Sequence, residues 1–293
     1  MLTIVLVSFH SEDLINNFLK RINNKFPVII IENSLNYKLK KIIKKKYKNT
    51  KIIIPQKNIG IPKALNLGIK KSKTKYIFIT SPDVIIYANT IKKLLKLANK
   101  NKNFSLLAPS YKNEKKYTNY QIFSKKVKKN KVIEVDWIDN NFILNKTEFT
   151  KKVFDENIFM YYETHDLCKR ISRFQKKMYV SKDLKFIHLN SSSTNNKFSF
   201  LNKINRNWHY NFSKFYYFKK HYGRLFALKK IFPNIIRSLK SIIKYRIYND
   251  KINYELSKAE LLGVIYSVFE MSPSFRPFEL IKFKKMNYLK NYE

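Results

Sequence analysis

Short apolar runs alternate with lysine-rich stretches over the first third of the chain. The runs are rich in isoleucine and valine and predict strands, whereas the stretches repeat apolar residues every three or four positions and predict helices. The predicted strands are residues 3–9, 27–33, 51–56 and 75–80, and the predicted helices are residues 13–24, 37–47, 62–72 and 89–101. This alternation is typical of an α/β fold, in which a mostly parallel sheet carries helices on both faces.

The pattern changes in the middle of the chain. Further strands are predicted at residues 104–111, 132–145 and 177–190, with one helix before the last of them. The stretch NSSSTNN at residues 190–196 is polar and rich in turn formers, which predicts a domain boundary. The sequence after it is helical in pattern and rich in aromatic residues. We therefore expect a domain of residues 1–200 and a helical C-terminal extension of residues 201–293.

Polar residues follow the first four predicted strands. They are Ser8–Glu12, Glu32–Ser34, Lys57–Gly60 and Ser81–Asp83. Ligands of such sheets bind beyond the carboxyl ends of the strands, although turn residues are polar in any protein. Two of the four glycines, Gly60 and Gly68, lie in the stretch KNIGIPKALNLG. A chain so poor in glycine is expected to keep it where a side chain would obstruct a turn or a ligand, which predicts a ligand loop.

The formal net charge of +40 would ordinarily indicate nucleic acid or an anionic membrane as a partner. Most of the basic residues are lysines, spread evenly with isoleucine and asparagine, which is typical of codon bias rather than of selected phosphate recognition. The aromatic residues also follow periodic apolar faces rather than a base-stacking platform. A basic nucleic-acid-binding protein therefore stays an alternative, and we expect no specific nucleic acid partner.

Cysteine content and hydropathy bear on the compartment. The single cysteine, Cys168, excludes an internal disulfide and is typical of a reducing compartment. The opening residues MLTIVLVSFH predict a buried strand rather than a signal peptide, and we find no apolar run long enough to span a membrane. We expect a cytoplasmic protein, with peripheral association at the inner face of the cell membrane left open.

Two acidic positions suggest chemistry. Asp83 follows a predicted strand in ITSPDVII, where a carboxylate could hold a divalent cation on a diphosphate. A turn aspartate beside Pro82 explains it equally well. Glu163 and Asp166 lie close together in NIFMYYETHDLCKRI. From spacing alone, this acidic cluster is typical of the N-terminus of an ordinary helix.

The ordered set of motifs resembles family 2 glycosyltransferases, particularly the rhamnosyltransferase-like bacterial branch. The motifs are VIIIENS, KNIGIPKALNLG, ITSPDV, EVDWIDNNFIL, VFDENIFMYYETHDLCKR and FIHLNSSS. The resemblance covers roughly residues 1–200, and NWHYNFSKFYYFKKHYG resembles the segment that follows the catalytic domain. It implies a GT-A fold with a Rossmann-like mixed sheet, a dTDP- or UDP-linked sugar donor, Mg²⁺ or Mn²⁺, and a cell-surface polysaccharide or lipid-linked glycan as acceptor.

The resemblance also implies roles for the residues at the strand ends. Glu32 and Asn33 match the positions that contact the nucleoside, and we group Ser8 with them. Asn58, Gly60 and Asn66 match the loop that holds the ribose and diphosphate. Asp83 matches the acid of a DxD motif that binds the metal, and Ser81 stands where many members carry aspartate or asparagine. His188 matches a histidine that reaches the metal or diphosphate in some relatives, although a structural histidine explains it too.

The acidic cluster matches the catalytic site of the family. Inverting transfer needs a general base beside the acceptor hydroxyl. Thr164 stands where relatives carry aspartate and cannot act as a base, so the function passes to Asp166, with Glu163 as the next candidate, or the protein is catalytically silent. We expect Glu163 in the first turn of a helix, where the helix dipole keeps it ionised.

The remaining expectations concern the acceptor. Asp155 and Glu156 match a turn that shapes the acceptor pocket in relatives, and a plain turn explains them equally well. Trp137 would stack on a sugar or belong to the core. Asn140 replaces a glycine of the relatives and is expected at positive φ. His165 is expected to be structural or to face the acceptor.

The tail carries one strongly periodic segment. Its apolar residues are Leu225, Leu228, Phe232, Ile235, Leu239 and Ile242, with lysines and arginines between them. A basic amphipathic helix of this kind, bent near Pro233, could lie on an anionic membrane surface. The alternative is a helix packed on the domain with its lysines in water.

Overall fold

The structure, a computed structural model, describes residues 1–101, 103–112, 118–123, 131–189 and 199–277. Contacts divide the described residues into two compact units. The first takes its residues from Met1–Asp155 and Glu163–Asn195, and the second from Glu156–Tyr162 and Asn196–Glu293. The predicted boundary at residues 190–196 lies outside the described residues. The division at residue 200 therefore stays a prediction.

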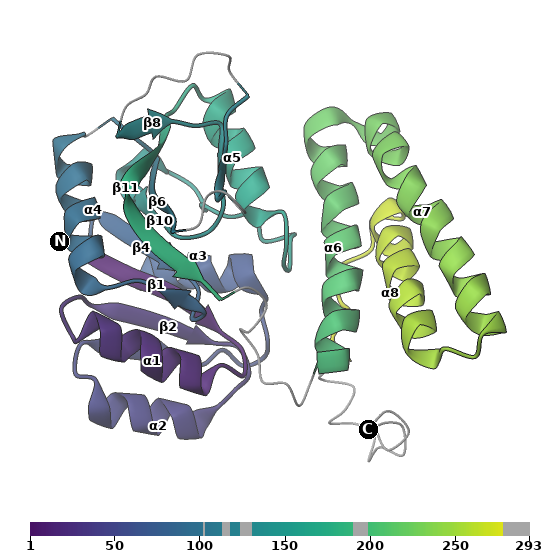
Figure 1. The fold of residues 1–293 in the computed structure, drawn as a ribbon, viewed down its shortest axis with the longest axis horizontal. Coiled ribbons are helices and arrows are strands. Elements are labelled where there is room, and N and C mark those ends of the chain that lie inside the picture. The colour runs from purple at the N-terminus through teal and green to yellow at the C-terminus, as the bar shows by residue number, and fades with distance from the viewer. Residues whose placement is uncertain (102, 113–117, 124–130, 190–198, 278–293) are drawn as a thin grey trace. The chain divides into compact units, whose positions relative to one another are not determined.

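A mixed sheet forms the centre of the first unit (Figure 1). Its parallel part consists of β1 (Leu2–Ser8), β2 (Val28–Glu32), β3 (Thr50–Ile53) and β4 (Tyr76–Thr80). It continues through β10 (Phe142–Asn145), β6 (Leu106–Tyr111), β11 (Met178–His188) and β5 (Val84–Ile85), in the order β3-β2-β1-β4-β10-β6-β11-β5. A short strand, β8 (Val132–Glu134), pairs with β11.

The direction of β10 decides which residues meet at the edge of the sheet. β10 runs antiparallel to β4, with Phe142 opposite Ile79. Its first residues therefore lie at the edge where β4 ends. β11 also ends at this edge, because it runs parallel to β6, and β6 runs antiparallel to β10. There His188 pairs with Val84 of β5. We call this edge the carboxyl rim.

Helices cover both faces of the sheet, as the α/β pattern predicts. One core lies under α1 (Glu12–Ile22), α2 (Tyr37–Lys46) and α4 (Ala88–Lys100), and the other under α3 (Ile61–Lys71) and α5 (Glu163–Arg173). Side chains of β1 alternate between the two, since Ile4 and Leu6 belong to the first core and Val5 to the second. A strand that buries both faces must be apolar throughout, which explains its uninterrupted run.

The two glycines of the predicted ligand loop have different positions in the structure: Gly60 precedes α3, and Gly68 lies within it. Gly60, with φ of 79°, occupies the N-cap of α3, so its left-handed backbone turns the chain into the helix. Gly68 lies in the last turns of the helix, where an added Cβ would clash with the Val5 side chain on β1. Gly68 therefore allows close packing of α3 on β1, and only Gly60 remains in the loop.

A small two-stranded sheet adjoins the central one. It pairs β7 (Tyr120–Gln121) with β9 (Trp137–Ile138), and a single 3₁₀ turn, η1 (Lys146–Glu148), follows β10. Cys168 of α5 is within 3.6 Å of the Ile138 carbonyl oxygen. This contact packs α5 against β9 and brings the residues after β9 close to the start of α5.

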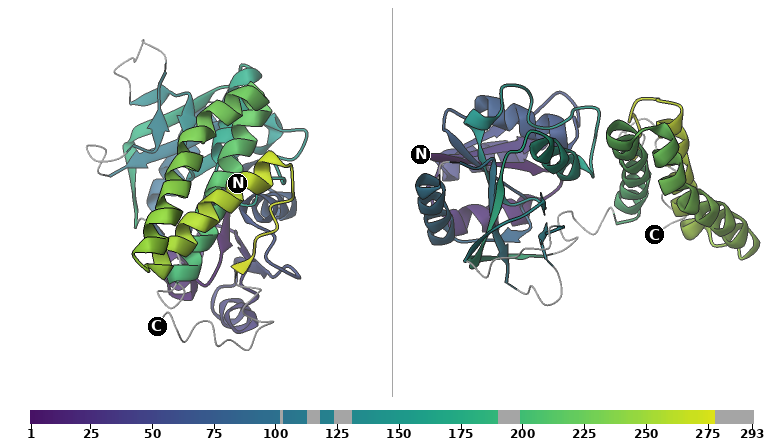
Figure 2. Two further views of the ribbon diagram at one scale, coloured as in Figure 1. Left: turned by 90° about the vertical axis from the view of Figure 1, so that its right-hand side faces the viewer. Right: turned by 90° about the horizontal axis from the view of Figure 1, so that it is seen from above.

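The second unit contains α6 (Ser199–Tyr222), α7 (Arg224–Ile247) and α8 (Lys251–Val268), which pack side by side (Figure 2). Trp208 is its largest buried residue, and it stacks on Phe212. Gly263 of α8 lies against the Trp208 carbonyl, where an added Cβ would clash. No helix among the described residues is both long and apolar enough to cross a membrane.

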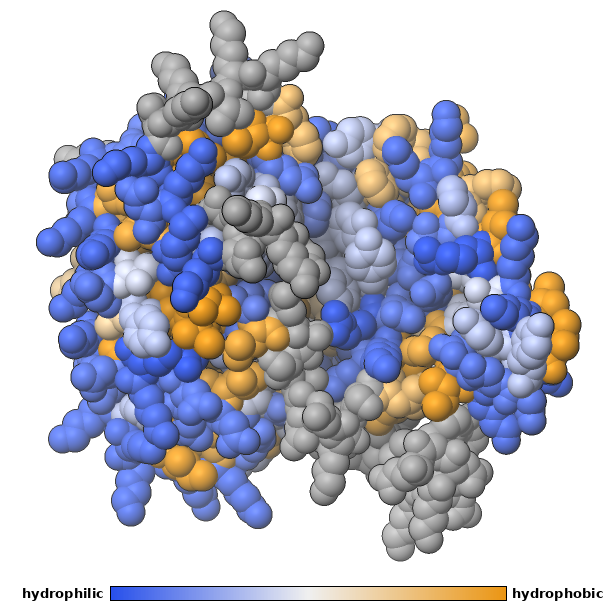
Figure 3. Space-filling model, in the orientation of Figure 1, coloured by the Kyte–Doolittle hydropathy of each residue, from blue (hydrophilic) through white to orange (hydrophobic). Residues whose placement is uncertain are grey.

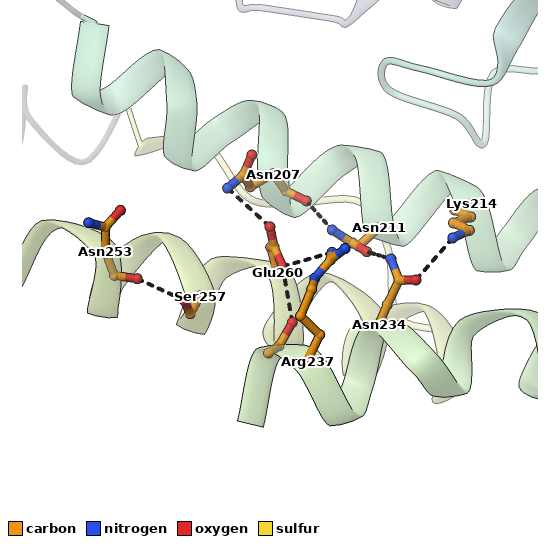
Figure 4. A network of polar contacts seen from close by, with 9 residues as sticks. Asn207, Asn211, Lys214, Asn234, Arg237, Asn253, Ser257 and Glu260 are labelled. Atoms are coloured by element: carbon orange, nitrogen blue, oxygen red, sulfur yellow. Dashed lines mark hydrogen bonds and ion pairs between the residues drawn. The ribbon is translucent and has the colours of Figure 1, made fainter. Parts of the chain in front are cut away.

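A polar network crosses these three helices (Figure 4). The Glu260 carboxylate accepts hydrogen bonds from Asn207, Arg237 and Ser238 at 3.5, 3.3 and 3.1 Å. The Asn234 amide in turn donates to Asn211 at 3.0 Å. Because buried polar groups must find partners, the network specifies how the helices pack against one another.

The segment Glu156–Tyr162 belongs to the helical unit although it lies within the chain of the first. Phe159 stacks on His209 with ring centroids 4.4 Å apart, and Ser213 donates to the Met160 carbonyl at 2.8 Å. Tyr161 and Tyr162 have φ of 66° and 63°, which is costly for a bulky side chain. These contacts stabilise the strained turn that leads directly into α5.

Candidate active site at the carboxyl rim

Backbone and side-chain hydrogen bonds join three of the predicted strand ends. The Asn33 backbone N–H donates to the Ser8 carbonyl at 2.8 Å, and the Asn33 amide donates to the Gly60 carbonyl at 3.2 Å. The Gly60 N–H donates to Asn58 Oδ1 at 3.0 Å. Ser8, Asn33, Asn58 and Gly60 therefore lie together, as the sequence predicts for residues at the ends of neighbouring parallel strands.

Several polar atoms at these strand ends are buried without a hydrogen bond. Ser8 Oγ, Glu32 Oε2 and Asn33 Oδ1 have no such partner among the described residues. Burial raises the pKa of Glu32 above its ordinary value, although the Ser34 hydroxyl, the nearby Ser8 hydroxyl and the Ser34 backbone N–H oppose this effect. Unsatisfied buried polar atoms are costly, so their concentration at a sheet edge indicates a polar ligand.

Asn66 is held by the backbone of a distant segment, and its contact with the diphosphate stays a prediction. Its Nδ2 donates to the Phe154 carbonyl at 2.8 Å, and its Oδ1 accepts from the Phe154 N–H at 3.0 Å. Both ends of the amide thus hold the backbone just before Asp155. In this geometry Asn66 positions the chain that leads to the acceptor turn.

Asp83 and His188 form an ion pair where β5 meets β11. His188 Nε2 lies 3.2 Å from Asp83 Oδ2, and the Asp83 side chain is 5% exposed. Burial opposes ionisation of Asp83, but the hydrogen bond and charge of His188 outweigh it and hold the pKa of Asp83 below its ordinary value. The His188 ring also stacks on Tyr111, with centroids 6.2 Å apart. Ser81 is half-buried two residues before Asp83.

Asp83 fits a divalent cation, with His188 as its partner at Oδ2. Asp83 Oδ1 is buried and has no hydrogen-bond partner among the described residues, which leaves it available as a ligand. Within the described part of the chain, no group of three or more histidine, cysteine, aspartate or glutamate side chains could hold a metal. A cation at Asp83 and His188 would therefore take its remaining ligands from diphosphate and water, as Mg²⁺ commonly does.

Asp139 is a rim residue that the sequence reasoning missed. It precedes β10, and the neighbouring Asn141 accepts a hydrogen bond from Thr80 Oγ1 at 2.7 Å, which ties this segment to the end of β4. Burial raises the pKa of Asp139, while the Asn140 backbone N–H and the charge of His188 lower it. Asp139 is thus electrostatically coupled to the Asp83–His188 pair.

The position of the left-handed residue also differs from the prediction. Asn141, with φ of 84°, adopts the positive φ that was expected of Asn140. Asn140 instead interacts through its side chain with Glu163, the first residue of α5. The prediction for Asn140 is therefore wrong by one residue, although an asparagine does occupy the left-handed turn.

Glu163 is a buried carboxyl group with an unpaired oxygen. It is 5% exposed, and Oε2 has no hydrogen-bond partner among the described residues. Burial raises the pKa of Glu163 to about 7, and the charge of Asp139 adds to this effect. Hydrogen bonding from the helix N-terminus and Asn140 lowers the pKa only partly. The helix dipole therefore does not keep Glu163 fully ionised at neutral pH, contrary to our expectation.

Asp166, the favoured base from sequence, is engaged in a structural ion pair. It is fully buried and accepts from Arg170 Nε at 2.8 Å. The Arg170 guanidinium also donates to the Val153 carbonyl. Asp166 therefore holds α5 to the chain before the acceptor turn, which favours Glu163 over Asp166 as the base. Thr164 is buried beside them.

The predicted acceptor residues are less closely grouped. Trp137 is partly buried against the second core, with its ring 4.8 Å from the His165 ring. Burial lowers the pKa of His165 to about 4, so it is neutral at physiological pH. Asp155 and Glu156 are half-buried and belong to the first and second unit respectively. Trp137 and Asp155 thus lie in the same unit as Glu163, and Trp137 is on a strand, β9, that contacts α5.

The chain is similar to known proteins in both sequence and fold. The family model for glycosyl transferase family 2 matches residues 3–171. The comparison with curated protein sequences gives no match. One similar structure is the mannosyltransferase PcManGT from Pyrobaculum calidifontis in complex with GDP-Man and Mn²⁺, with 10% identity, a TM-score of 0.55, and coverage of 92% of this chain and 87% of that one.

A second similar structure is GalNAc-T7 with UDP, GalNAc and Mn²⁺. It has 13% identity and a TM-score of 0.54, and the match covers 64% of this chain and 43% of that one. At these identities the likeness concerns the fold, which is that of GT-A glycosyltransferases. The predicted fold class is confirmed.

Proposed function

The chain belongs to glycosyl transferase family 2 and is a glycosyltransferase, and we propose that it moves a sugar from a nucleotide-diphospho-sugar to a hydroxyl group of a glycan acceptor with inversion. The observation that carries this proposal is Glu163, a buried carboxyl group with a pKa of about 7, whose Oε2 has no hydrogen-bond partner within the part of the chain that the structure describes. Asp139 couples it electrostatically to the rim that holds Asp83 and His188. The base, Glu163, and the site of the leaving diphosphate at Asp83 and His188 would thus belong to one reaction centre.

The donor binds at the ends of β1, β2 and β3 in this proposal. The unpaired atoms of Ser8, Glu32 and Asn33 support recognition of the nucleoside, and the backbone around Asn58 and Gly60 lies beside them. Asn66 positions the neighbouring chain through Phe154. We expect a uridine or thymidine diphospho-sugar, such as a rhamnose donor. Because one structural neighbour contains GDP-mannose, guanosine diphospho-sugars are included in the binding experiment below.

Asp83 and His188 would hold a divalent ion, Mg²⁺ or Mn²⁺, with Ser81 close by. Both structural neighbours described above contain Mn²⁺, which supports this assignment. The ion would supply positive charge to the diphosphate as it leaves. The pairing of β5 with β11 fixes both side chains in place, and His188 orients Asp83 through Oδ2. Oδ1, which has no hydrogen-bond partner among the described residues, would then be the oxygen left for the ion.

Glu163 would accept the proton of the acceptor hydroxyl. The acceptor oxygen forms a bond to the anomeric carbon while the bond between that carbon and the diphosphate oxygen breaks, and the electron pair leaves with the nucleoside diphosphate. Attack from the face opposite the diphosphate inverts the configuration. A base with a pKa near the working pH accepts the proton efficiently. Asp166 serves as a positioning residue through Arg170.

The acceptor would approach from the side of α5. Trp137, whose ring lies beside that of His165, would contact a sugar. Asp155 and Glu156 would shape the turn that follows Phe154, which Asn66 holds by two hydrogen bonds. We propose a cell-surface polysaccharide precursor or lipid-linked glycan as the acceptor, with residues 1–200 as the catalytic domain and residues 201–293 as a helical extension. The enzyme would then work at the inner face of the cell membrane.

Thermal shift and turnover together test the function. The purified chain is heated with UDP-, dTDP- and GDP-sugars, each with and without Mn²⁺, and a ligand at about 100 times its Kd should add about 2.7 kcal/mol of stability. Release of nucleoside diphosphate is then measured for the stabilising donor. Glu163→Gln should abolish release but keep the thermal shift, whereas Glu134→Gln, at an exposed position on β8, should leave both unchanged. Full release by Glu163→Gln would refute the assignment of the base.

A further inference from the structure

Helix α7 exposes a continuous apolar stripe. Five side chains recur at steps of four, three, four and four along one side of the helix: Phe232, Ile236, Leu239, Ile243 and Ile247. Their exposed fractions are 59%, 38%, 45%, 62% and 75%. Single exposed apolar residues are ordinary on protein surfaces, but a contiguous row on one helix indicates an interaction surface. We call this row the α7 stripe.

The stripe is separate from the face that holds α7 in its own unit. Ala227 and Ile231 point into the core with Val264 of α8, and Leu228 and Ile235 pack against the same cluster. The predicted apolar face is thus divided in the structure. Its inward part closes the helical unit, and its outward part remains exposed. Packing inside the unit therefore does not explain the stripe.

Cations flank the stripe, and α7 contains no acidic residue. Its basic residues are Arg224, Lys229, Lys230, Arg237, Lys240, Lys244 and Arg246. Lys240 and Arg237 also line a shallow, mostly apolar groove of about 440 Å³ together with Phe232, Pro233 and Ile236. In Figure 3, hydrophobic side chains lie at the outer edge of this helix among hydrophilic ones.

We propose that the α7 stripe binds the surface of an anionic lipid bilayer. Aliphatic side chains between lysines match the interface of such a membrane, where the apolar row enters the acyl boundary and the cations pair with lipid phosphates. Nucleic acid would use the cations but not a row of isoleucines and leucines, because bases stack on aromatic or guanidinium planes. The helix lies on the bilayer rather than crossing it, since no described helix is apolar enough to span it.

Vesicle flotation of the full chain tests the proposal. One set of vesicles contains phosphatidylcholine alone, and the other contains equal parts of phosphatidylcholine and phosphatidylglycerol. We expect the chain to float with the anionic vesicles only. The double variant Ile243→Glu/Ile247→Glu should weaken this binding at least about tenfold, because it places charge in the acyl boundary. Both positions are well exposed, so helix content and melting temperature should match the parent.

The chain offers a matched control on α2. Tyr37 and Ile42 are 61% and 53% exposed among lysines. The variant Tyr37→Glu/Ile42→Glu therefore changes the net charge equally without touching the α7 stripe. It should bind anionic vesicles within about twofold of the parent, since surface charge acts over roughly one Debye length.

Three results would overturn the proposal. Equal losses in the two double variants would mean that net charge alone drives binding. Unchanged flotation of Ile243→Glu/Ile247→Glu would exclude the stripe. A parent that sediments as a dimer without lipid, and a variant that sediments as a monomer, would identify the stripe as a contact between two copies of the chain. The assay needs no donor or acceptor, so its outcome is independent of the proposed reaction.

Discussion

Replacing Glu163 with glutamine should stabilise the protein at alkaline pH while abolishing transfer. Burial raises the pKa of Glu163 from 4.5 to about 7. The unfolded chain loses this proton near pH 4.5, whereas the folded protein keeps it to about pH 7. An acid whose pKa is raised by folding therefore destabilises the folded state as the pH rises through this window. Glutamine has the same shape and cannot ionise, so the variant avoids the cost.

The size of the effect follows from the pKa. A shift of about 2.5 units at about 1.36 kcal/mol per unit gives about 3 kcal/mol. Glu163→Gln should thus gain about 3 kcal/mol over the parent between about pH 4.5 and about pH 8. Replacing the carboxyl OH with an amide NH₂ also changes the unfolding free energy by an amount that does not depend on pH. This constant amount does not affect the result, because only the change of the difference with pH is compared. Asp139 is the titratable neighbour whose charge acts on Glu163, and His165 stays neutral across the window.

Urea denaturation across this pH range measures the effect. The difference in unfolding free energy between parent and Glu163→Gln is plotted against pH. If this difference does not change with pH, or falls as the pH rises, the carboxylate is already solvated or paired with a cation in the folded protein. The account of Glu163 as a buried base would then be wrong.

Three further changes probe the same rim and its support. Asp139→Asn removes a negative charge near Glu163, so the acidic limb of the pH profile of kcat/KM should move to lower pH, whereas a purely structural role would lower activity without moving the limb. His188→Ala should raise the Mn²⁺ concentration needed for half-maximal activity by about tenfold or more, measured by metal titration, because Asp83 loses its partner. Gly68→Ala adds a methyl group against β1 and should cost about 1–3 kcal/mol in urea denaturation, with the affinity for the donor unchanged in the folded protein.

Local pattern was enough to place most of the first unit. The predicted strands at residues 3–9, 27–33, 51–56 and 75–80 coincide with β1 to β4, and the predicted helices coincide with α1 to α4. Each of these helices buries one face in one of the two cores, and the strands bury side chains in both, so the periodicity of each element is visible in the sequence itself. The family resemblance is confirmed by the match over residues 3–171. The rhamnosyltransferase-like branch stays a prediction.

Contacts between distant segments were not visible in the same way. The two hydrogen bonds between the Asn66 amide and the Phe154 backbone join residues far apart in the chain. The ion pair of His188 with Asp83 does the same. The ion pair between Asp166 and Arg170 is local, because the two residues are four positions apart on one helix. The spacing alone did not reveal that Asp166 would be buried and would have Arg170 as its partner. Charge and spacing indicate which residues can react, but burial and partners decide which of them remains available.

Asp139 offers a physical explanation for the threonine at position 164, where the family resemblance implies an aspartate. Threonine there leaves Glu163 without an acidic residue directly after it, while Asp166 is paired with Arg170. The antiparallel direction of β10 brings Asp139 to the same rim, where its charge raises the pKa of Glu163. A second carboxylate thus acts on Glu163, the proposed base, from the segment between β9 and β10. The two groups should then titrate together, and an Asp139→Asn variant with an unmoved pH profile would contradict this role of Asp139.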